Sequence, residues 1–301
     1  MPNDTASRLP GSPGQRQMAL GAFWFAVMSV LVKLSGQRLP SMEVVFVRAV
    51  FTLGLSVWLV RRAGVRPALG RRHRPLLLRG IFGSVALSCF YYSLVHLPLA
   101  EATVVQFTNP VFTALLAAWL LGERFHWAEA ACAAASLAGV VLVAQPAALF
   151  GRGPAIPAGG AAIALLGALC SAVAYVMVRR VGTSESPLVV VLYLPLVTVP
   201  LSLPFAVAQW SWPTPAEWLG LVGVGITTQI AQLHMTRGLQ TETAARATSV
   251  GYLQIVFAAA WGALLFGQWP NRWSVLGAAV IVGSTLAVAR LSRAPVVVEV
   301  E

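Results

Sequence analysis

The sequence predicts an all-α integral membrane protein with ten transmembrane helices arranged as two inverted five-helix repeats. Of its 301 residues, 57% are hydrophobic and 10% are charged, whereas a soluble domain carries about 25% charged residues. The apolar residues gather in runs of about 20, the length that an α-helix needs to cross a hydrocarbon core of about 30 Å. One run also matches a later one without a gap, which indicates an internal duplication.

The runs give the predicted elements in chain order. Each has the length of one membrane span, and the spans divide into a first repeat at 17–145 and a second at 159–290. Polar residues 1–16 are expected to be a disordered tail rather than a signal peptide, 146–158 a linker and 291–301 a second tail. The expected spans are 17–36, 43–60, 76–97, 101–121, 127–145, 159–180, 187–208, 216–236, 243–266 and 273–290.

The basic charge of the chain follows its predicted topology. A net charge of +11 would suggest nucleic acid in a soluble protein, but here the basic residues are spread over the loops. With the N-terminus inside, most of them lie in cytoplasmic loops and adjoining helix ends, Arg79 among them. The opposite side holds only Lys33, Arg38, Arg152 and Arg272. The positive-inside rule therefore places both termini in the cytoplasm. We expect a multi-pass protein of the cytoplasmic membrane whose partner is lipid and not nucleic acid.

The duplication is visible at an offset of 145 residues. Segment 102–122 aligns with 247–267, and nine of the 21 pairs are identical. Five spans precede the linker and five follow it, so the second copy enters the membrane from the opposite side. Inverted repeats of this kind are typical of alternating-access transporters, which bind substrate near the midplane between the repeats.

Polar residues within the spans indicate where a cavity lies. A polar side chain facing lipid is costly, so such residues face the bundle interior or a cavity. They form stripes on the third and fourth spans and on the equivalent eighth and ninth. Interhelical hydrogen bonds, worth about 0.6 kcal/mol each, are the alternative role for these side chains. The predicted cavity residues are Tyr92, Ser93, His96, Thr103, Gln106, Asn109, Pro110, Thr228, Gln229, Gln232, Ser249, Tyr252 and Gln254.

Three charged residues are candidates for binding or coupling. Arg48 is the one cation well inside a span, where its planar fork suits a carboxylate or phosphate; a structural ion pair or snorkelling to the headgroups is the alternative. Glu43 opens the same span. Glu101 begins the fourth helix, where it either stabilises the helix dipole or carries protons. With Arg246 near a span interior, Arg48 favours an anionic or zwitterionic substrate.

Two further helices carry small residues at helix-packing spacing. Such faces allow close contact between helices, either within one molecule or across a homodimer. The residues are Ala131, Ala135 and Gly139 in the fifth span and Ala279, Gly283 and Ala287 in the tenth.

These motifs together resemble a known family. The five-plus-five spans, with LLGER at 120–124 and its counterpart LLFGQ at 264–268, are similar to the two EamA domains of the drug/metabolite transporter superfamily. Within that superfamily, EVVFVR at 43–48, LRGIFGS at 78–84 and the segment 91–112 resemble the solute carrier 35 subfamily G branch.

The resemblance implies a cavity lined by the first, third, fourth, sixth, eighth and ninth helices, with the fifth and tenth behind them. Family members move amino acids, nucleotide sugars, organic anions, vitamins and drugs, so membership leaves the cargo open. The second repeat departs from the first, because Ile255 stands at the position of Pro110 and Gln268 at that of Glu123. The positions that match the motifs are Arg48, Tyr92, Gln106, Asn109 and Pro110.

The sequence therefore predicts a secondary transporter of a small polar or amphipathic metabolite of the amino acid or organic anion class, and the resemblance to the family implies export. Proton-coupled uptake through Glu43, Glu101 or His96 is the alternative within transport. An intramembrane enzyme or a channel fits poorly, because the sequence has no HExxH or GxSxG motif and no ring of like charges. The three cysteines are too scattered for a metal site, and we expect neither metal nor cofactor.

Overall fold

The computed structural model describes residues 12–35, 38–97, 99–123, 126–145, 158–267 and 269–291. These residues form twelve α-helices and one short 3₁₀ turn, with no β-strand among them. The first unit comprises α1 (Pro13–Ser35), α2 (Ser41–Arg62), α3 (His73–His96), α4 (Leu99–Gln106), α5 (Asn109–Leu121) and α6 (Trp127–Ala144). The second comprises α7 (Ala158–Val181), α8 (Pro187–Ala208), α9 (Pro215–Thr241), α10 (Ala244–Gly251), α11 (Leu253–Phe266) and α12 (Arg272–Leu291).

The helices follow the predicted spans closely. Helix α1 begins at Pro13, earlier than the predicted first span. The fourth span of each unit consists of two consecutive helices, α4 with α5 and α10 with α11. Residues 1–11, 146–157 and 292–301, which carry most of the predicted tails and linker, lie outside the described residues.

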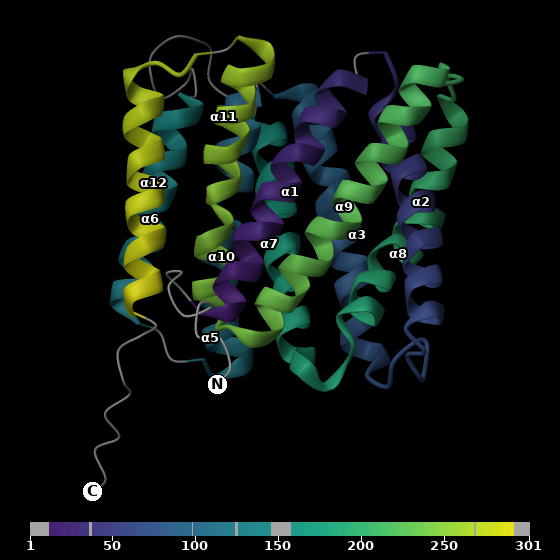
Figure 1. Ribbon diagram of the computed structural model, residues 1–301, viewed down its shortest axis with the longest axis horizontal. Coiled ribbons are helices and arrows are strands. Elements are labelled where there is room, and N and C mark those ends of the chain that lie inside the picture. Colours follow the sequence, from purple (N-terminus) through teal and green to yellow (C-terminus); the bar gives the residue numbers. More distant parts are fainter. Residues whose placement is uncertain are drawn as a thin grey trace, which may run out of the picture.

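Eight of the segments that the structure describes are long and apolar enough to cross a membrane. Helices α1 and α9 are not among these eight. These two helices pack against each other in the middle of the bundle (Figure 1). Gln17 Oε1 lies 2.6 Å from His234 Nδ1 across this contact. Helices α1 and α9 therefore direct polar groups toward each other.

The two units pack in equivalent ways. Helix α1 packs on α9 as α7 packs on α3, and α1 contacts α11 as α7 contacts α5. The pairs α6 with α12 and α2 with α8 each join equivalent helices, and they form opposite edges of the bundle (Figure 1).

Contacts along α6 and α12 show the relative direction of the units. Ser136 Oγ lies 2.6 Å from Ser284 Oγ, and Gln145 donates to Asn271 Oδ1 at 2.7 Å. Residue numbers therefore rise along α6 as they fall along α12. Equivalent helices run antiparallel, so the two units face in opposite directions.

Glycines bring α6 and α12 into close contact. A Cβ atom on Gly277 would lie 2.5 Å from the Gly139 carbonyl oxygen, and a Cβ on Gly139 would lie 2.7 Å from Ile281. Within one molecule, the predicted small-residue face forms a close contact at Gly139 of α6 but not at Ala279 and Gly283 of α12, where the homodimer alternative stays a prediction. Ala279 and Gly283 are exposed, because they lie on the side of α12 turned away from α6.

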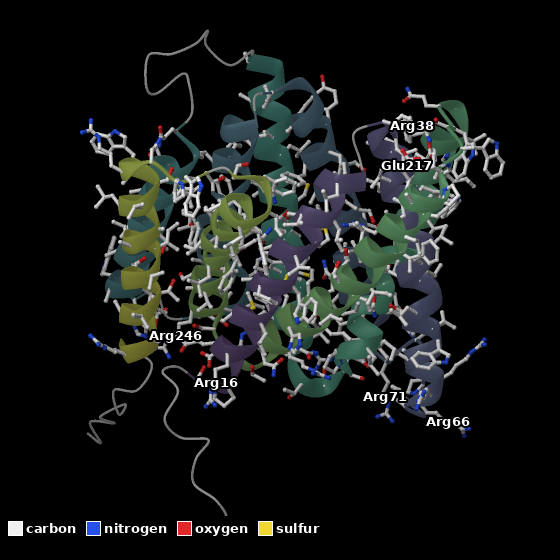
Figure 2. The ribbon with its side chains drawn as sticks, turned by 45° about the horizontal axis from the view of Figure 1, so that its top comes forward. Arg16, Arg38, Arg66, Arg71, Glu217 and Arg246 are labelled. Atoms are coloured by element: carbon white, nitrogen blue, oxygen red, sulfur yellow. The ribbon has the colours of Figure 1, made fainter. Side chains whose placement is uncertain are left out.

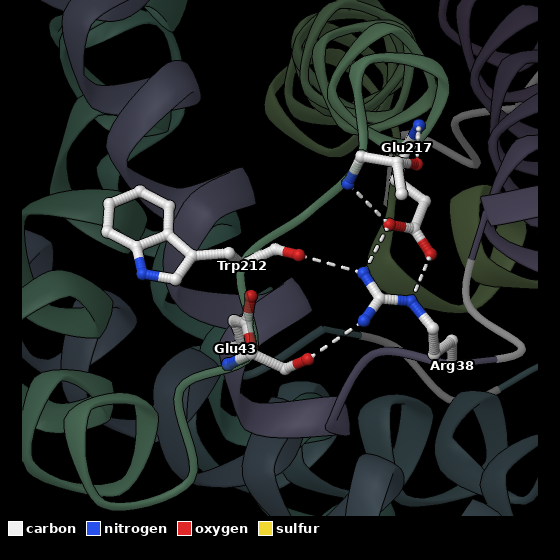
Figure 3. Close-up of polar contacts among 6 residues, drawn as sticks. Arg38, Glu43, Trp212 and Glu217 are labelled. Atoms are coloured by element: carbon white, nitrogen blue, oxygen red, sulfur yellow. Dashed lines mark hydrogen bonds and ion pairs between the residues drawn. The ribbon is translucent and has the colours of Figure 1, made fainter.

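At one end of the bundle, an arginine joins the two units (Figure 3). Arg38 donates to both carboxylate oxygens of Glu217 at 3.0 and 2.7 Å, and to the Trp212 carbonyl at 2.8 Å. The bonds to Glu217 raise the pKa of Arg38 above its ordinary value. The fully buried Glu43 accepts from the Ser211 amide at 2.9 Å. The loop before α9 is thus held by two residues of the first unit.

The opposite end contains an equivalent contact with the units exchanged. Glu185, just before α8, accepts from the backbone amides of Arg71 and Arg72 at 2.6 and 2.7 Å. Each unit therefore holds the loop before the other unit's third helix through a carboxylate near the start of its own second helix. Figure 2 shows Arg16, Arg66, Arg71 and Arg246 at the end opposite Arg38 and Glu217.

The α6–α12 contact yields a stability prediction. We expect Gly277→Ala to lower the melting temperature of the detergent-purified protein, because the new methyl group meets backbone and overpacking costs about 1–3 kcal/mol. Gly283→Ala is the matched control on the same helix, where a Cβ meets nothing within 4 Å. That variant should melt at or above the wild-type temperature, since alanine favours a helix over glycine. Equal destabilisation by both substitutions would contradict this packing.

Candidate substrate cavity

A cavity of about 220 Å³ lies between the two units. Its lining comes from α1, α2, α3, α4, α5, α7, α8, α9, α10 and α11, while none of the described residues of α6 and α12 contributes. Methionine and aromatic side chains supply much of the wall. The polar and charged residues in the lining are Arg48, Arg79, Tyr91, Gln106, Asn109, Ser171, Tyr175, Gln232, Thr248 and Gln254.

The helix breaks of the two units meet beside this cavity. Phe107 lies between α4 and α5, and Tyr252 occupies the equivalent position between α10 and α11. Their rings stack with centroids 5.9 Å apart and an interplanar angle of 29°. The residues flanking the breaks, Gln106 and Asn109 in one unit and Gly251 and Gln254 in the other, all line the cavity.

The two breaks have different local causes. Pro110 has no amide proton, so it cannot donate to the Gln106 carbonyl one turn earlier. The second unit has Ile255 instead, and its amide bonds to the Tyr252 carbonyl at 3.0 Å, a three-residue turn that is tighter than the α-helix. The break is thus preserved without the proline.

Two arginines are buried in the cavity wall. Arg48 and Arg79 are 7% and 3% exposed, and no acidic residue is found among the described residues of the lining. The sequence-based prediction that Arg79 lies at the cytoplasmic end is wrong. It donates from Nη2 to Gln232 Oε1 at 2.9 Å, and this bond turns the guanidinium inward.

An amide and a hydroxyl group connect α4 to α7 at the same wall. Gln106 Nε2 donates to Ser171 Oγ at 3.3 Å, and Asn109 of α5 and Tyr175 of α7 also line the cavity. Polar groups at the edge of the cavity can bind a polar ligand.

Six of the predicted site residues line the main cavity: Arg48, Gln106, Asn109, Pro110, Gln232 and Gln254. The stripe on α3 requires correction. Tyr92 is 38% exposed, whereas its neighbour Tyr91 lines the cavity. Ser93 is buried and donates to the Cys89 carbonyl at 2.8 Å, and Cys89 faces Gly167 of α7. The cavity face of α3 is therefore turned by one residue, about 100°, from the predicted stripe, and Cys89 of that stripe faces α7.

Polar residues of the second unit also differ from expectation. Gln229 exchanges hydrogen bonds with Ser56 at 3.2 and 2.9 Å, and with Thr228 it borders a separate small cavity. Ser249 is buried and donates to the Ala245 carbonyl at 2.8 Å. Tyr252 is fully buried in an apolar cluster behind the cavity. Gln229 is thus satisfied across helices, as the interhelical alternative predicts, and Ser249 within its own helix. The hydroxyls of Thr228 and Tyr252 have no hydrogen-bond partner among the described residues.

The remaining candidates lie away from the cavity. Thr103 is not among its lining residues, Glu43 holds the Ser211 amide, and Arg246 Nε pairs with Glu129 at 2.6 Å. Glu43 and Arg246 are therefore paired with groups outside the cavity lining. The side chains of His96 and Glu101 lie outside the described residues.

A membrane bundle of two oppositely directed units around a central cavity has the architecture of a membrane transporter. The model of the EamA-like transporter family matches residues 13–145 and 158–290. The chain belongs to this family, as the motifs of its sequence indicated. It is a multi-pass membrane protein with one family domain in each unit.

Named relatives are transporters of several kinds. The pseudopaline exporter CntI of Pseudomonas aeruginosa strain UCBPP-PA14 is 31% identical, over 91% of this chain and 95% of its own length. Mouse solute carrier family 35 member G1 is 30% identical over 88% of this chain and 75% of that protein. The S-adenosylmethionine uptake transporter of Rickettsia prowazekii is 26% identical, with coverages of 88% and 91%.

The fold has also been observed in a crystal structure. That chain superposes with a TM-score of 0.81 at 22% identity, over 94% of this chain and 99% of its own. At that identity the likeness concerns the fold alone.

The stacked pair at the helix breaks yields a second prediction. The buried Tyr252 hydroxyl has no hydrogen-bond partner among the described residues, and an unpaired buried polar group costs about 1–3 kcal/mol. We therefore expect Tyr252→Phe to raise the melting temperature, while Tyr252→Leu, which also removes the stacked ring, should lower it. Similar losses in both variants would show that the hydroxyl is hydrogen-bonded.

Proposed function

We propose that this protein is a secondary transporter that exports a small polar or amphipathic metabolite, of the amino acid or organic anion class, by alternating access through the central cavity. The observation that carries the proposal is the position of the cavity, which lies between oppositely directed units and at the break of both fourth helices. Broken helices expose backbone groups to a ligand at the midplane of inverted-repeat transporters. The cavity volume is below the roughly 300–1,000 Å³ of typical ligand pockets, which favours a small substrate.

We further propose ten membrane spans. Helices α1 and α9 complete the count, because their polar residues are directed toward each other and the cavity, which spares them contact with lipid. Arginines gather at the end where α1 begins (Figure 2). By the positive-inside rule, this end is cytoplasmic, which would place both chain termini in the cytoplasm and the protein in the cytoplasmic membrane.

Two relatives bear on the direction of transport. One is named an exporter and another an uptake transporter, and the exporter is the more similar to this chain. Proton-coupled uptake is the second candidate. It is favoured by Glu43, a fully buried carboxyl group whose Oε1 has no hydrogen-bond partner in the described part of the chain.

Substitutions in the cavity wall test the proposal. A thermal-shift screen of amino acids and organic anions would first identify a ligand, because a compound that binds only the folded state raises its stability. In proteoliposome counterflow with that ligand, we expect Gln106→Ala and Asn109→Ala each to weaken the apparent affinity about tenfold, the effect of losing about 1.4 kcal/mol of binding.

Leu115→Ala is the matched control, because Leu115 lies on α5 with half of its side chain exposed and does not line the cavity. Its counterflow should equal that of the wild type. If the cavity variants and the control transport alike, substrate does not pass through this cavity.

A further inference from the structure

We propose that Arg79 and Arg48 form an oxyanion site, and that the substrate enters the cavity with a carboxylate or phosphate bound by these two guanidinium groups. This inference rests on the proposed function and specifies the chemical class of the substrate. It also assigns to Arg79 the role of main specificity-determining residue.

The electrostatics of the cavity require a partner of negative charge. Arg48 and Arg79 are both more than nine-tenths buried, and an unpaired charge in a poorly solvated site is costly. The described lining supplies amides, hydroxyls and aromatic rings but no carboxylate to offset them. A bound anion would provide the missing charge.

Three other arginines in the described chain differ from the two cavity arginines, because each is paired with a glutamate. Arg38, Arg179 and Arg246 each pair with a glutamate at 2.6–2.7 Å, and each pair lies outside the cavity lining. The positive charge of Arg38, Arg179 and Arg246 is therefore offset by a carboxylate of the protein itself. Neither cavity arginine has such a partner among the described residues.

The hydrogen bonds of Arg79 leave donors for a ligand. Its Nη2 donates to Gln232 Oε1, and the other terminal nitrogen, Nη1, makes no hydrogen bond to a described residue and is not among the buried atoms, unlike Nε. A guanidinium binds a carboxylate or phosphate through two parallel N–H donors. The neutral amide of Gln232 orients the fork without neutralising its charge.

Gly83 provides the space in which the Arg79 guanidinium lies. A Cβ atom at this position would be 3.0 Å from Arg79 Nη1 and 2.8 Å from Leu194 Cδ1. Gly83 lies one helical turn after Arg79 on the cavity face of α3, and both residues line the cavity. An alanine at 83 would therefore displace the guanidinium without changing its charge.

The rest of the wall suits the organic part of such a substrate. Met18, Met28 and Met235 and the rings of Phe25, Phe90 and Phe107 line the same cavity. Methionine adapts its shape to different apolar groups. The site thus combines a charged anchor with an apolar, adaptable chamber, which suits an amphipathic organic anion.

Matched pairs of anionic and neutral ligands test the proposal. The probes are succinate against succinamide for the carboxylate, and glycerol 3-phosphate against glycerol for the phosphate, each measured by thermal shift and by proteoliposome counterflow. We expect at least one anion to stabilise the wild type and to be transported, with no effect of its neutral counterpart. Arg79→Gln should weaken that anion at least tenfold, and Arg79→Lys less, because lysine keeps the charge but loses the fork.

Two further variants separate binding from folding. Gly83→Ala should weaken the same anion although Arg79 is intact, and Arg61→Gln, at an exposed position of α2, should leave its transport unchanged. Arg79→Gln should melt at or above the wild-type temperature without ligand, because it removes a buried unpaired charge. A large loss of stability would instead mark Arg79 as structural and overturn the proposal.

The outcomes also distinguish this proposal from the proposed function. Transport of the anion at the wild-type rate by Arg79→Gln would overturn the oxyanion site and leave the transporter intact. Binding of an anion that depends on Arg79, without flux of that anion in counterflow, would support the site and contradict transport. Equal effects of charged and neutral probes on the wild type would overturn the oxyanion site.

Discussion

In the hydrocarbon core of a membrane, a backbone amide or carbonyl without a partner costs several kcal/mol, and the arrangement of this protein depends on where such groups are tolerated. Both fourth helices are interrupted, yet both interruptions lie at the interface between the units. There Phe107 and Tyr252 stack on each other, and the flanking residues border a polar cavity. A break facing lipid would be unstable, so the two units must remain packed together at their centre.

The same constraint explains the order of the remaining helices. Helices α1 and α9, which carry many polar side chains, pack on each other, while α6 and α12 stand behind the cavity and join through glycines at a close backbone contact. Carboxylates at each end hold the loop of the opposite unit, Glu43 at one and Glu185 at the other. Polar interactions thus connect the units at both ends of the bundle, and close packing connects them at the contact between α6 and α12.

The sequence is sufficient to predict the helices and the duplication, because long apolar runs and a repeated segment are local signals. It also predicts Gln106, Asn109 and Pro110 beside the cavity, since a proline among polar residues within a span is typical of a helix break that faces a cavity.

The sequence does not determine the rotation of α3, where Tyr91 rather than Tyr92 borders the cavity. Both tyrosines carry the same side chain, and only packing on α7 decides between them. Arg79 lies near a helix end, which predicts a place at the membrane surface, and only its bond to Gln232 shows that it turns inward.

The charge of the cavity lining has an electrical consequence. With two guanidinium groups and no carboxylate in the described lining, an empty cavity would carry two positive charges, one with a monocarboxylate would carry one, and one with a dicarboxylate none. Moving one elementary charge through a membrane potential of 100 mV corresponds to about 2.3 kcal/mol. To the extent that these charges move within the membrane field, voltage would act differently on the empty and the loaded carrier. The valence of the substrate would then decide which half of the transport cycle the membrane potential drives.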